Sequence, residues 1–274
     1  MLHKTRATAE EEASGDKESL LVLRDVGKRF SNGVVALRNV DLAIRQGDFL
    51  SLLGPSGCGK STALRLIAGL SSPTTGVLDW RAGAKGRSEI GFVFQEPTLL
   101  PWASVFDNVW LPLRLRGVSR DKAEPAIREM IERVHLSGFE KAMPRELSGG
   151  MKMRVSIARG LVTRPRLLLM DEPFAALDEI TRFRLNADLL DLWQEERFTV
   201  VFVTHSVFES VFLSSRIVVM AARPGRVFRE IGVDAPYPRD ETFRTSPDYA
   251  SLCRETSGVL GEAITLGGGV HDGH

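Results

Sequence analysis

The stretch FLSLLGPSGCGKSTALRLIAGL, residues 49–70, combines a strand, a loop and a helix in one run. Its first five residues are almost all apolar and predict a buried strand, and the segment from Lys60 onward predicts a helix. The loop between them contains Gly54, Gly57 and Gly59, and the lysine is followed by a serine. Glycines at this spacing between a strand and a helix are typical of a P-loop, the phosphate-binding element of nucleoside triphosphatases. The stretch therefore predicts an α/β fold with a nucleotide site.

Each part of this loop has its own task toward a nucleotide. Backbone N–H groups of residues 57–61 would surround the β-phosphate, Lys60 would reach the β- and γ-phosphates, and the Ser61 hydroxyl would bind Mg²⁺. The alternative is a glycine turn with an exposed lysine, but the eight-residue pattern matches in full. The expected nucleotide-binding residues are Gly54, Pro55, Ser56, Gly57, Cys58, Gly59, Lys60, Ser61 and Thr62. The Cys58 thiol is expected to be open to modification when the loop is empty.

Composition limits the classes of protein to which the chain can belong. With 274 residues, 43% of them hydrophobic, it can bury the core of one large domain, alone or with a small subdomain. The net charge of +1 gives no overall basic field, so no nucleic-acid partner is expected. Two distant cysteines, Cys58 and Cys253, predict no disulfide framework and suit the cytosol. No apolar run approaches the roughly 18–20 residues that span a bilayer, and the N-terminus lacks the apolar segment of a secretory signal.

The order of apolar runs predicts the architecture. Runs such as FLSLLG, IGFVFQ, RLLLMD, TVVFVT and RIVVM alternate with helical patterns, which is typical of a mostly parallel sheet covered on both faces. The first two strands, around LRDVGKRF and VVALRNVDLAI, have no helix between them and predict an antiparallel flank. We therefore expect an α/β fold with a RecA-like P-loop core, an antiparallel β flank and an inserted helical subdomain.

Domain boundaries follow from the same patterns. Residues 1–19 are polar and charged and are expected to be disordered. The main domain is expected at residues 20–235, with its helical subdomain at about 96–158, where the strand pattern stops. Residues 236–274 form a C-terminal extension, and its glycine-rich last ten residues, 265–274, are expected to be disordered.

Two further predicted strands end in residues that suit phosphate chemistry. Asp171 and Glu172 follow RLLLM, and His205 follows TVVFVT. The carboxyl ends of parallel strands share one edge, so these side chains are expected beside Lys60. Asp171 suits the Mg²⁺ site and Glu172 suits the base that activates water. The alternatives are carboxylates that cap the next turn and a histidine that only satisfies a local hydrogen bond.

Six motifs in order, GPSGCGKST, FQEP, LSGGM, LLLMDEP, AALD and VTHS, resemble those of the nucleotide-binding subunit of an ABC transporter. The resemblance extends over about residues 20–230 and implies ATP as ligand with Mg²⁺. It also implies that two subunits, expected to be identical, bind ATP head to tail. In that arrangement Ser148, Gly149 and Gly150, at the start of a helix, would hold the γ-phosphate of ATP on the partner's P-loop.

The resemblance assigns roles to four further residues. Gln95 matches the loop glutamine that touches Mg²⁺ and signals to the membrane subunit. Asp178 matches a contact across the dimer, and His205 matches the switch histidine on the γ-phosphate. Phe30 stands where the family stacks an aromatic ring on adenine, although a phenylalanine there could equally belong to the core. Met151 and the pair Ala175 and Ala176 depart from the usual glutamine and serine, but neither change removes a phosphate contact.

Finer resemblance, in TLLPWASVFDNVWLPL and DEPFAALDEITR, is to importer ATPases for nitrate, sulfonate or taurine. It implies an integral membrane permease as partner, an external solute-binding protein and a place on the cytoplasmic face of the membrane. Trp102, beside Pro101, either packs locally or helps to receive a helix of the permease. The rival interpretations are an ABC ATPase of repair or translation, whose long coiled coil or second cassette is missing, and an ATP-sensing module, which would not need Glu172.

Overall fold

The computed structural model of the chain describes residues 19–81 and 90–268. The segments expected to be disordered therefore fall mostly outside the described residues. Ser19 is an exception, because it is the first residue of a strand and pairs with Arg45.

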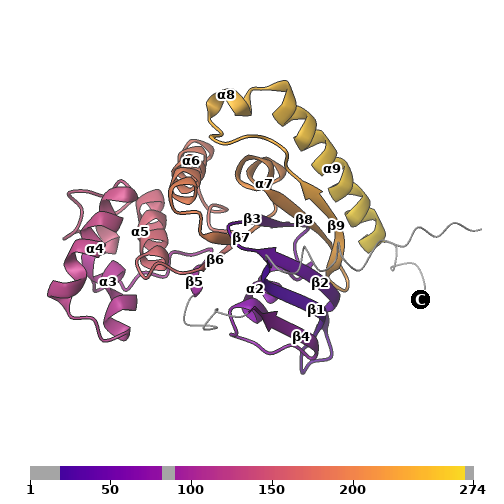
Figure 1. Ribbon diagram of the computed structural model, residues 1–274, viewed down its shortest axis with the longest axis horizontal. Coiled ribbons are helices and arrows are strands. Elements are labelled where there is room, and N and C mark those ends of the chain that lie inside the picture. The colour runs from indigo at the N-terminus through magenta and orange to yellow at the C-terminus, as the bar shows by residue number, and fades with distance from the viewer. Residues whose placement is uncertain (1–18, 82–89, 269–274) are drawn as a thin grey trace, which may run out of the picture.

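A six-stranded sheet forms the centre of the molecule, with the strand order β5-β6-β7-β3-β8-β9 (Figure 1). The first five of these strands are parallel, and β9 runs antiparallel to β8. Their bounds are β3 (Phe49–Leu53), β5 (Ile90–Val93), β6 (Leu167–Asp171), β7 (Thr199–Thr204), β8 (Arg216–Ala221) and β9 (Arg226–Gly232). The central strands are buried along their whole length, as the near-continuous apolar runs predicted.

Alternate residues of these strands enter two separate cores. On one face, Phe49 packs edge-on against Trp193, with ring centroids 5.8 Å apart. On the other face, Leu50 and Leu52 pack with the first helix and with the smaller sheet. The helices that supply these faces are α2 (Lys60–Ile67), α6 (Glu179–Glu196) and α7 (Val207–Leu213). The sheet is thus covered on both faces. The carboxyl ends of its parallel strands lie along one edge of the sheet, and this edge is called the sheet edge below.

A second sheet of three antiparallel strands, in the order β2-β1-β4, packs over α2. The strands are β1 (Ser19–Arg29), β2 (Val35–Arg45) and β4 (Thr75–Trp80). The expected antiparallel flank is confirmed. Strand β4 was not predicted, because four of its six residues are exposed and its short run lacks a clear apolar pattern.

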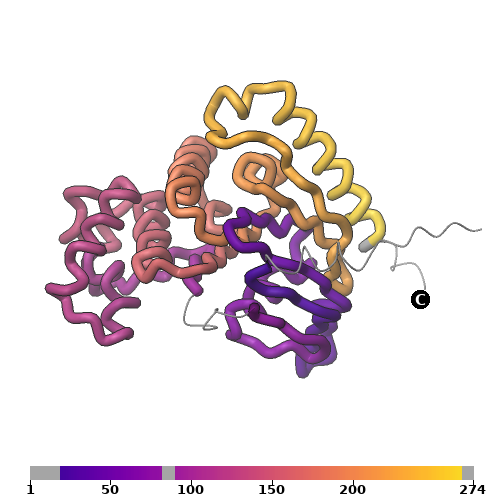
Figure 2. The backbone as a smooth tube through the Cα atoms, viewed as in Figure 1, coloured from indigo at the N-terminus to yellow at the C-terminus, as the bar shows by residue number. Residues whose placement is uncertain are grey.

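Three helices and a short 3-10 turn form a lobe between β5 and β6. They are α3 (Val105–Leu115), α4 (Arg120–Arg133), η2 (Pro144–Glu146) and α5 (Gly149–Leu161). The chain leaves the sheet after β5 and returns at the neighbouring β6, so that the lobe stands to one side (Figure 2). The inserted helical subdomain is confirmed, although α5 continues beyond residue 158 because Leu161 is still packed in the core.

The C-terminal extension lies over α7 and the last two strands. It consists of α8 (Glu241–Arg244) and α9 (Pro247–Gly268), and α9 packs on β8, β9 and α7 (Figure 1). The disorder expected from residue 265 is wrong for residues 265–268, which belong to α9. The helix continues there because Ala263 is buried, and Thr265 donates its hydroxyl to the carbonyl of Gly261.

No helix in residues 19–81 and 90–268 combines the length and the apolar character that a membrane crossing requires.

Candidate nucleotide site

The glycine loop after β3 has the backbone shape that its sequence predicted. Gly57 and Gly59 have φ angles of 77° and 92°, in the left-handed region that other residues rarely adopt. A Cβ atom at Gly59 would also lie 2.6 Å from the Leu37 side chain and 2.9 Å from the carbonyl oxygen of Ala36. Only glycine fits there, and helix α2 begins at the next residue with its N–H groups facing the loop.

Lys60 is held at the mouth of this loop. Its side chain is only 4% exposed, and Nζ donates to the carbonyl oxygens of Gly54 at 2.7 Å and Pro55 at 3.2 Å. Nζ also lies 3.7 Å from Oε1 of Glu172. The ammonium group at the start of α2 therefore faces a carboxylate that directly follows β6.

Ser61 and Asp171 form a pair beside the lysine. The Ser61 hydroxyl donates to Oδ1 of Asp171 at 2.8 Å. Burial raises the pKa of Asp171 above its usual value, and the hydrogen bond from Ser61 acts in the opposite direction. Two hard oxygen donors at the end of a phosphate loop fit Mg²⁺, which takes one or two protein ligands together with phosphate oxygens.

Glu172 and His205 complete the edge of the sheet. Nδ1 of His205 lies 3.1 Å from Oε2 of Glu172, within hydrogen-bond distance. Glu172 has a φ of 46°, an uncommon value outside glycine, and donates its N–H to the carbonyl of Val203. Because β6, β7 and β3 are neighbours, the structure brings Lys60, Glu172 and His205 together as the sequence predicted.

Two of the expected nucleotide residues, Gln95 and Phe30, follow other strands, β5 and β1. Gln95 is exposed two residues beyond β5, which is the neighbour of β6. Phe30 is 41% exposed directly after β1, with Nζ of Lys28 5.6 Å from its ring centroid. A core role for Phe30 is therefore wrong, and its exposed ring leaves the stacking role open.

Cys58 differs from the expectation for its thiol. The side chain is fully buried in the core between the two sheets, and burial raises its pKa. A Cβ atom at Gly54 would lie 2.7 Å from the Cys58 sulfur, so the thiol points away from the open side of the loop into a closely packed region. Only the backbone of Cys58 can serve a nucleotide.

The LSGGM segment is presented by the helical lobe. Ser148 caps α5 by accepting the N–H of Met151 at 3.2 Å, and both Ser148 and Gly149 are exposed. Gly150 is buried, and a Cβ atom there would lie 2.7 Å from the Thr181 methyl group, so a larger residue would not fit without movement. Asp178 is also exposed and caps α6 by accepting the N–H of Thr181 at 2.9 Å, which lowers its pKa. A Cβ atom at Gly149 would lie 3.4 Å from the Leu177 side chain, so the start of α5 and the loop before α6 are close together.

Sequence reasoning missed a tie between the lobe and the loop that follows Gln95. Arg159 of α5 donates to the carbonyl oxygens of Pro97 at 2.8 Å and Thr98 at 2.9 Å. Burial lowers the pKa of its guanidinium. A basic residue within an otherwise buried helical stretch was the available signal, but its partners could not be read from spacing alone.

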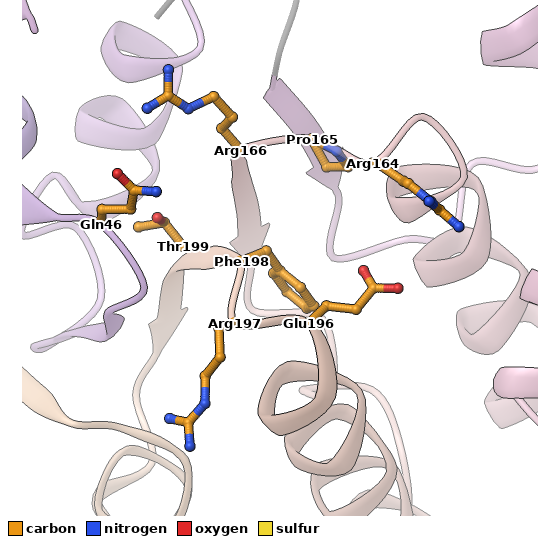
Figure 3. A pocket seen from close by; sticks show the side chains of 8 residues that line it. All are labelled: Gln46, Arg164, Pro165, Arg166, Glu196, Arg197, Phe198 and Thr199. Atoms are coloured by element: carbon orange, nitrogen blue, oxygen red, sulfur yellow. The ribbon is translucent and has the colours of Figure 1, made fainter. Parts of the chain in front are cut away.

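A separate cavity of about 440 Å³ lies at the opposite edge of the sheet, where β6 and β7 begin. It is lined by Gln46, Arg164, Pro165, Arg166, Glu196, Arg197, Phe198 and Thr199. The guanidinium groups of Arg164, Arg166 and Arg197 point in different directions and do not converge (Figure 3). This cavity therefore lacks the geometry of an anion site.

Residues 37–175 match the family model described as ABC transporter. An uncharacterized ABC transporter ATP-binding protein of Methanocaldococcus jannaschii, MJ0412, is 46% identical over 85% of this chain and 87% of its own length. The aliphatic sulfonates import ATP-binding protein SsuB of Bacillus cereus is 44% identical over 79% of this chain and 87% of its own.

Among solved structures, a dimeric post-hydrolysis state of the ATP-binding cassette MJ0796 bound to ADP and Pi is similar, with a TM-score of 0.69. It is 34% identical in sequence, and the match covers 79% of this chain and all of that one.

Proposed function

We propose, from the premise that this chain belongs to the ABC transporter family, that it drives the import of a small solute such as nitrate, a sulfonate or taurine. The chain is an ATP-binding subunit of an ABC transporter, and ATP hydrolysis is its activity. The observation that supports this best is the cluster of Lys60, Glu172 and His205 at one edge of the sheet, beside the Ser61–Asp171 pair.

In our proposal the loop binds ATP through the N–H groups of residues 57–61, with Phe30 against adenine. Lys60 exchanges the carbonyls of Gly54 and Pro55 for phosphate oxygens. Ser61, Asp171 and Gln95 would hold Mg²⁺, which would neutralise phosphate charge. The short distance between the Ser61 and Asp171 oxygens supports this assignment.

Hydrolysis then requires a base for the attacking water. Glu172 is proposed to accept the water proton, because its carboxylate lies at the strand end beside Lys60. His205, in hydrogen-bond contact with Glu172, is proposed to orient that carboxylate and to reach the γ-phosphate with its ring. The left-handed backbone of Glu172 supports this role, since such conformations cluster at functional sites.

Two copies are proposed to close over ATP head to tail. The exposed Ser148 and Gly149 at the start of α5 would hold the γ-phosphate bound by the partner, and Asp178 would touch the partner. A dimeric cassette among the similar structures supports the dimer. We expect the partner ATPase to be a second copy of this chain.

The same proposal places the dimer on the cytoplasmic face of the membrane, against an integral permease. An external binding protein would deliver the solute. The name of the SsuB relative favours an aliphatic sulfonate among the three candidate solutes. No feature of the described residues favours a nucleic-acid partner.

The test is ATP-driven uptake. The chain would be purified with its permease, which mass spectrometry would identify, and both would be reconstituted in vesicles with the cognate binding protein. We expect ATP-dependent accumulation of labelled sulfonate with the wild type and none with Glu172→Gln. Uptake of nitrate or taurine alone would correct the solute, and ATP hydrolysis without association with any membrane protein would contradict the transport role.

A further inference from the structure

Glu209 is a buried carboxylate in α7, close to the strand end that carries His205. The residue is 8% exposed, and its Oε2 accepts the hydroxyl proton of Thr204. The Thr204 oxygen in turn accepts the N–H of Ser206 at 3.0 Å, and the Ser206 hydroxyl accepts the N–H of Glu209 at 3.3 Å. Both neighbours of His205 in the chain are therefore bonded into one closed ring of contacts with Glu209.

The second oxygen of Glu209 faces α6. Nε of Arg182 lies 3.8 Å from Oε1 of Glu209, within ion-pair range. A terminal nitrogen of the same guanidinium donates to the carbonyl oxygen of Leu177 at 2.9 Å. Leu177 directly precedes Asp178, the exposed residue at the start of α6. One carboxylate thus connects the backbone on both sides of His205 to the loop that presents Asp178.

Burying a carboxylate at this position costs free energy of folding. Its burial raises the pKa of Glu209, and the Thr204 hydroxyl and the Arg182 charge only partly oppose that effect. Buried ion pairs of this kind can often be replaced by apolar side chains without loss of stability. Helix α7 already buries Val211, Phe212 and Leu213, so packing alone does not call for an acid. Its two oxygens instead face two different elements: Oε2 accepts a hydrogen bond from Thr204, and Oε1 lies at ion-pair range from Arg182 of α6.

We propose that Glu209 is a positioning residue for ATP hydrolysis, which holds His205 and the Leu177–Asp178 loop in one fixed arrangement. Thr204 transmits this constraint to His205, and Arg182 transmits it to the loop. The contact of His205 with the γ-phosphate and the contact of Asp178 with the partner then depend on the same carboxylate. This inference rests on the proposed function, because it assigns Glu209 no contact with ATP.

The experiment uses the full chain and compares isosteric changes. Thr204→Val removes the hydroxyl, and Glu209→Gln removes the charge, while Thr204→Ser keeps the hydroxyl. We expect the first two variants to lower kcat by about tenfold with KM for ATP within about twofold, because the phosphate loop is untouched. Thr204→Ser should stay within about twofold of wild type in both constants. Glu241→Gln, an exposed acid on α8, is the matched control and should behave as wild type.

A double-mutant cycle separates positioning from simple stabilisation. In a His205→Ala chain, assayed at high protein concentration, Glu209→Gln should lower the residual kcat by clearly less than tenfold, because His205 is already gone and only the hold on the Leu177–Asp178 loop is left to lose. The same tenfold loss in that background, or unchanged kcat with a lower thermal midpoint, would overturn the positioning role. If the wild type hydrolyses ATP and Thr204→Val and Glu209→Gln both keep the wild-type kcat, the positioning role is overturned as well. A wild type without ATPase activity would instead contradict the proposed function.

Discussion

The sheet edge and the LSGGM segment are each expected to touch a γ-phosphate, the first on ATP bound by its own chain and the second on ATP bound by the partner, and they differ in structure. At the sheet edge, Glu172 lies between the other two residues, with Oε1 3.7 Å from Nζ of Lys60 and Oε2 3.1 Å from Nδ1 of His205. Ser148 and Gly149 are exposed, and the hydroxyl of Ser148 bonds only within its own helix cap. One half of the site is thus assembled within a single chain, and the other half faces outward.

The difference follows from how each half is supported. Strand pairing fixes the sheet edge, because neighbouring parallel strands carry their ends to one line. The LSGGM segment belongs to α5, which packs on α3, α4, α6 and β5. When two such copies pair, the exposed half of each chain can face the assembled half of the other. The pair then contains two complete sites.

The largest effect is expected at the assembled half. Glu172→Gln keeps the size of the side chain but removes the base, so kcat should fall by roughly 10²-fold or more while ATP binding survives. Turnover and equilibrium binding of a fluorescent ATP analogue would be measured together. Glu255→Gln, an exposed acid on α9, is the control. Turnover within threefold of wild type would show that the base lies elsewhere.

The second prediction concerns the direction in which LSGGM acts. Lys60→Ala destroys the phosphate loop and Ser148→Arg fills the γ-phosphate position, so each variant alone should be inactive. Mixing them creates heterodimers in which the intact loop of one chain faces the intact Ser148 of the other. We expect partial recovery of ATPase activity, because one complete site forms per heterodimer.

A signature that acts within its own chain leaves every site in that mixture broken. Heterodimer formation must be shown with two differently tagged chains, since some paired ATPases need both sites. ATP-dependent dimerisation of Glu172→Gln would be measured by light scattering alongside. A monomeric Glu172→Gln at saturating MgATP, together with an inactive mixture, would end the head-to-tail proposal.

The sequence predicted the assembled half better than its surroundings. Residues at strand ends, such as Asp171 and His205, could be grouped because parallel strands share an edge. The partners of Arg159 could not be predicted, because they depend on how α5 packs against a loop distant in sequence. The contact between Glu209 and Arg182 depends in the same way on how α7 packs against α6. Strand β4 was missed for lack of pattern, and the orientation of the Cys58 thiol needed the actual packing of the loop.

A smaller effect is expected at Trp102 of the helical lobe, on association with the permease. Trp102 is 73% exposed, which argues against the packing interpretation and for a contact surface. Trp102→Ala should weaken association with the permease by about tenfold while the ATPase rate of the free subunit stays within about twofold. Leu115→Ala, another exposed apolar residue of the lobe, is the control. Proportional loss of both properties, or no loss of either, would contradict the docking role.

The smallest effect is expected for chemical labelling of Cys58, which tests whether the phosphate loop is already fully packed before ATP binds. The Cys58 thiol is buried and its pKa is raised by that burial, so little reactive thiolate is exposed. In a Cys253→Ser chain, which leaves one thiol, we expect a maleimide to react slowly, with rates that differ by less than about twofold with and without MgATP. Unfolded protein provides the reference for a fully accessible thiol. Rapid labelling that MgATP suppresses would show that the empty loop opens, and the sheet edge would then be no better assembled before binding than LSGGM is.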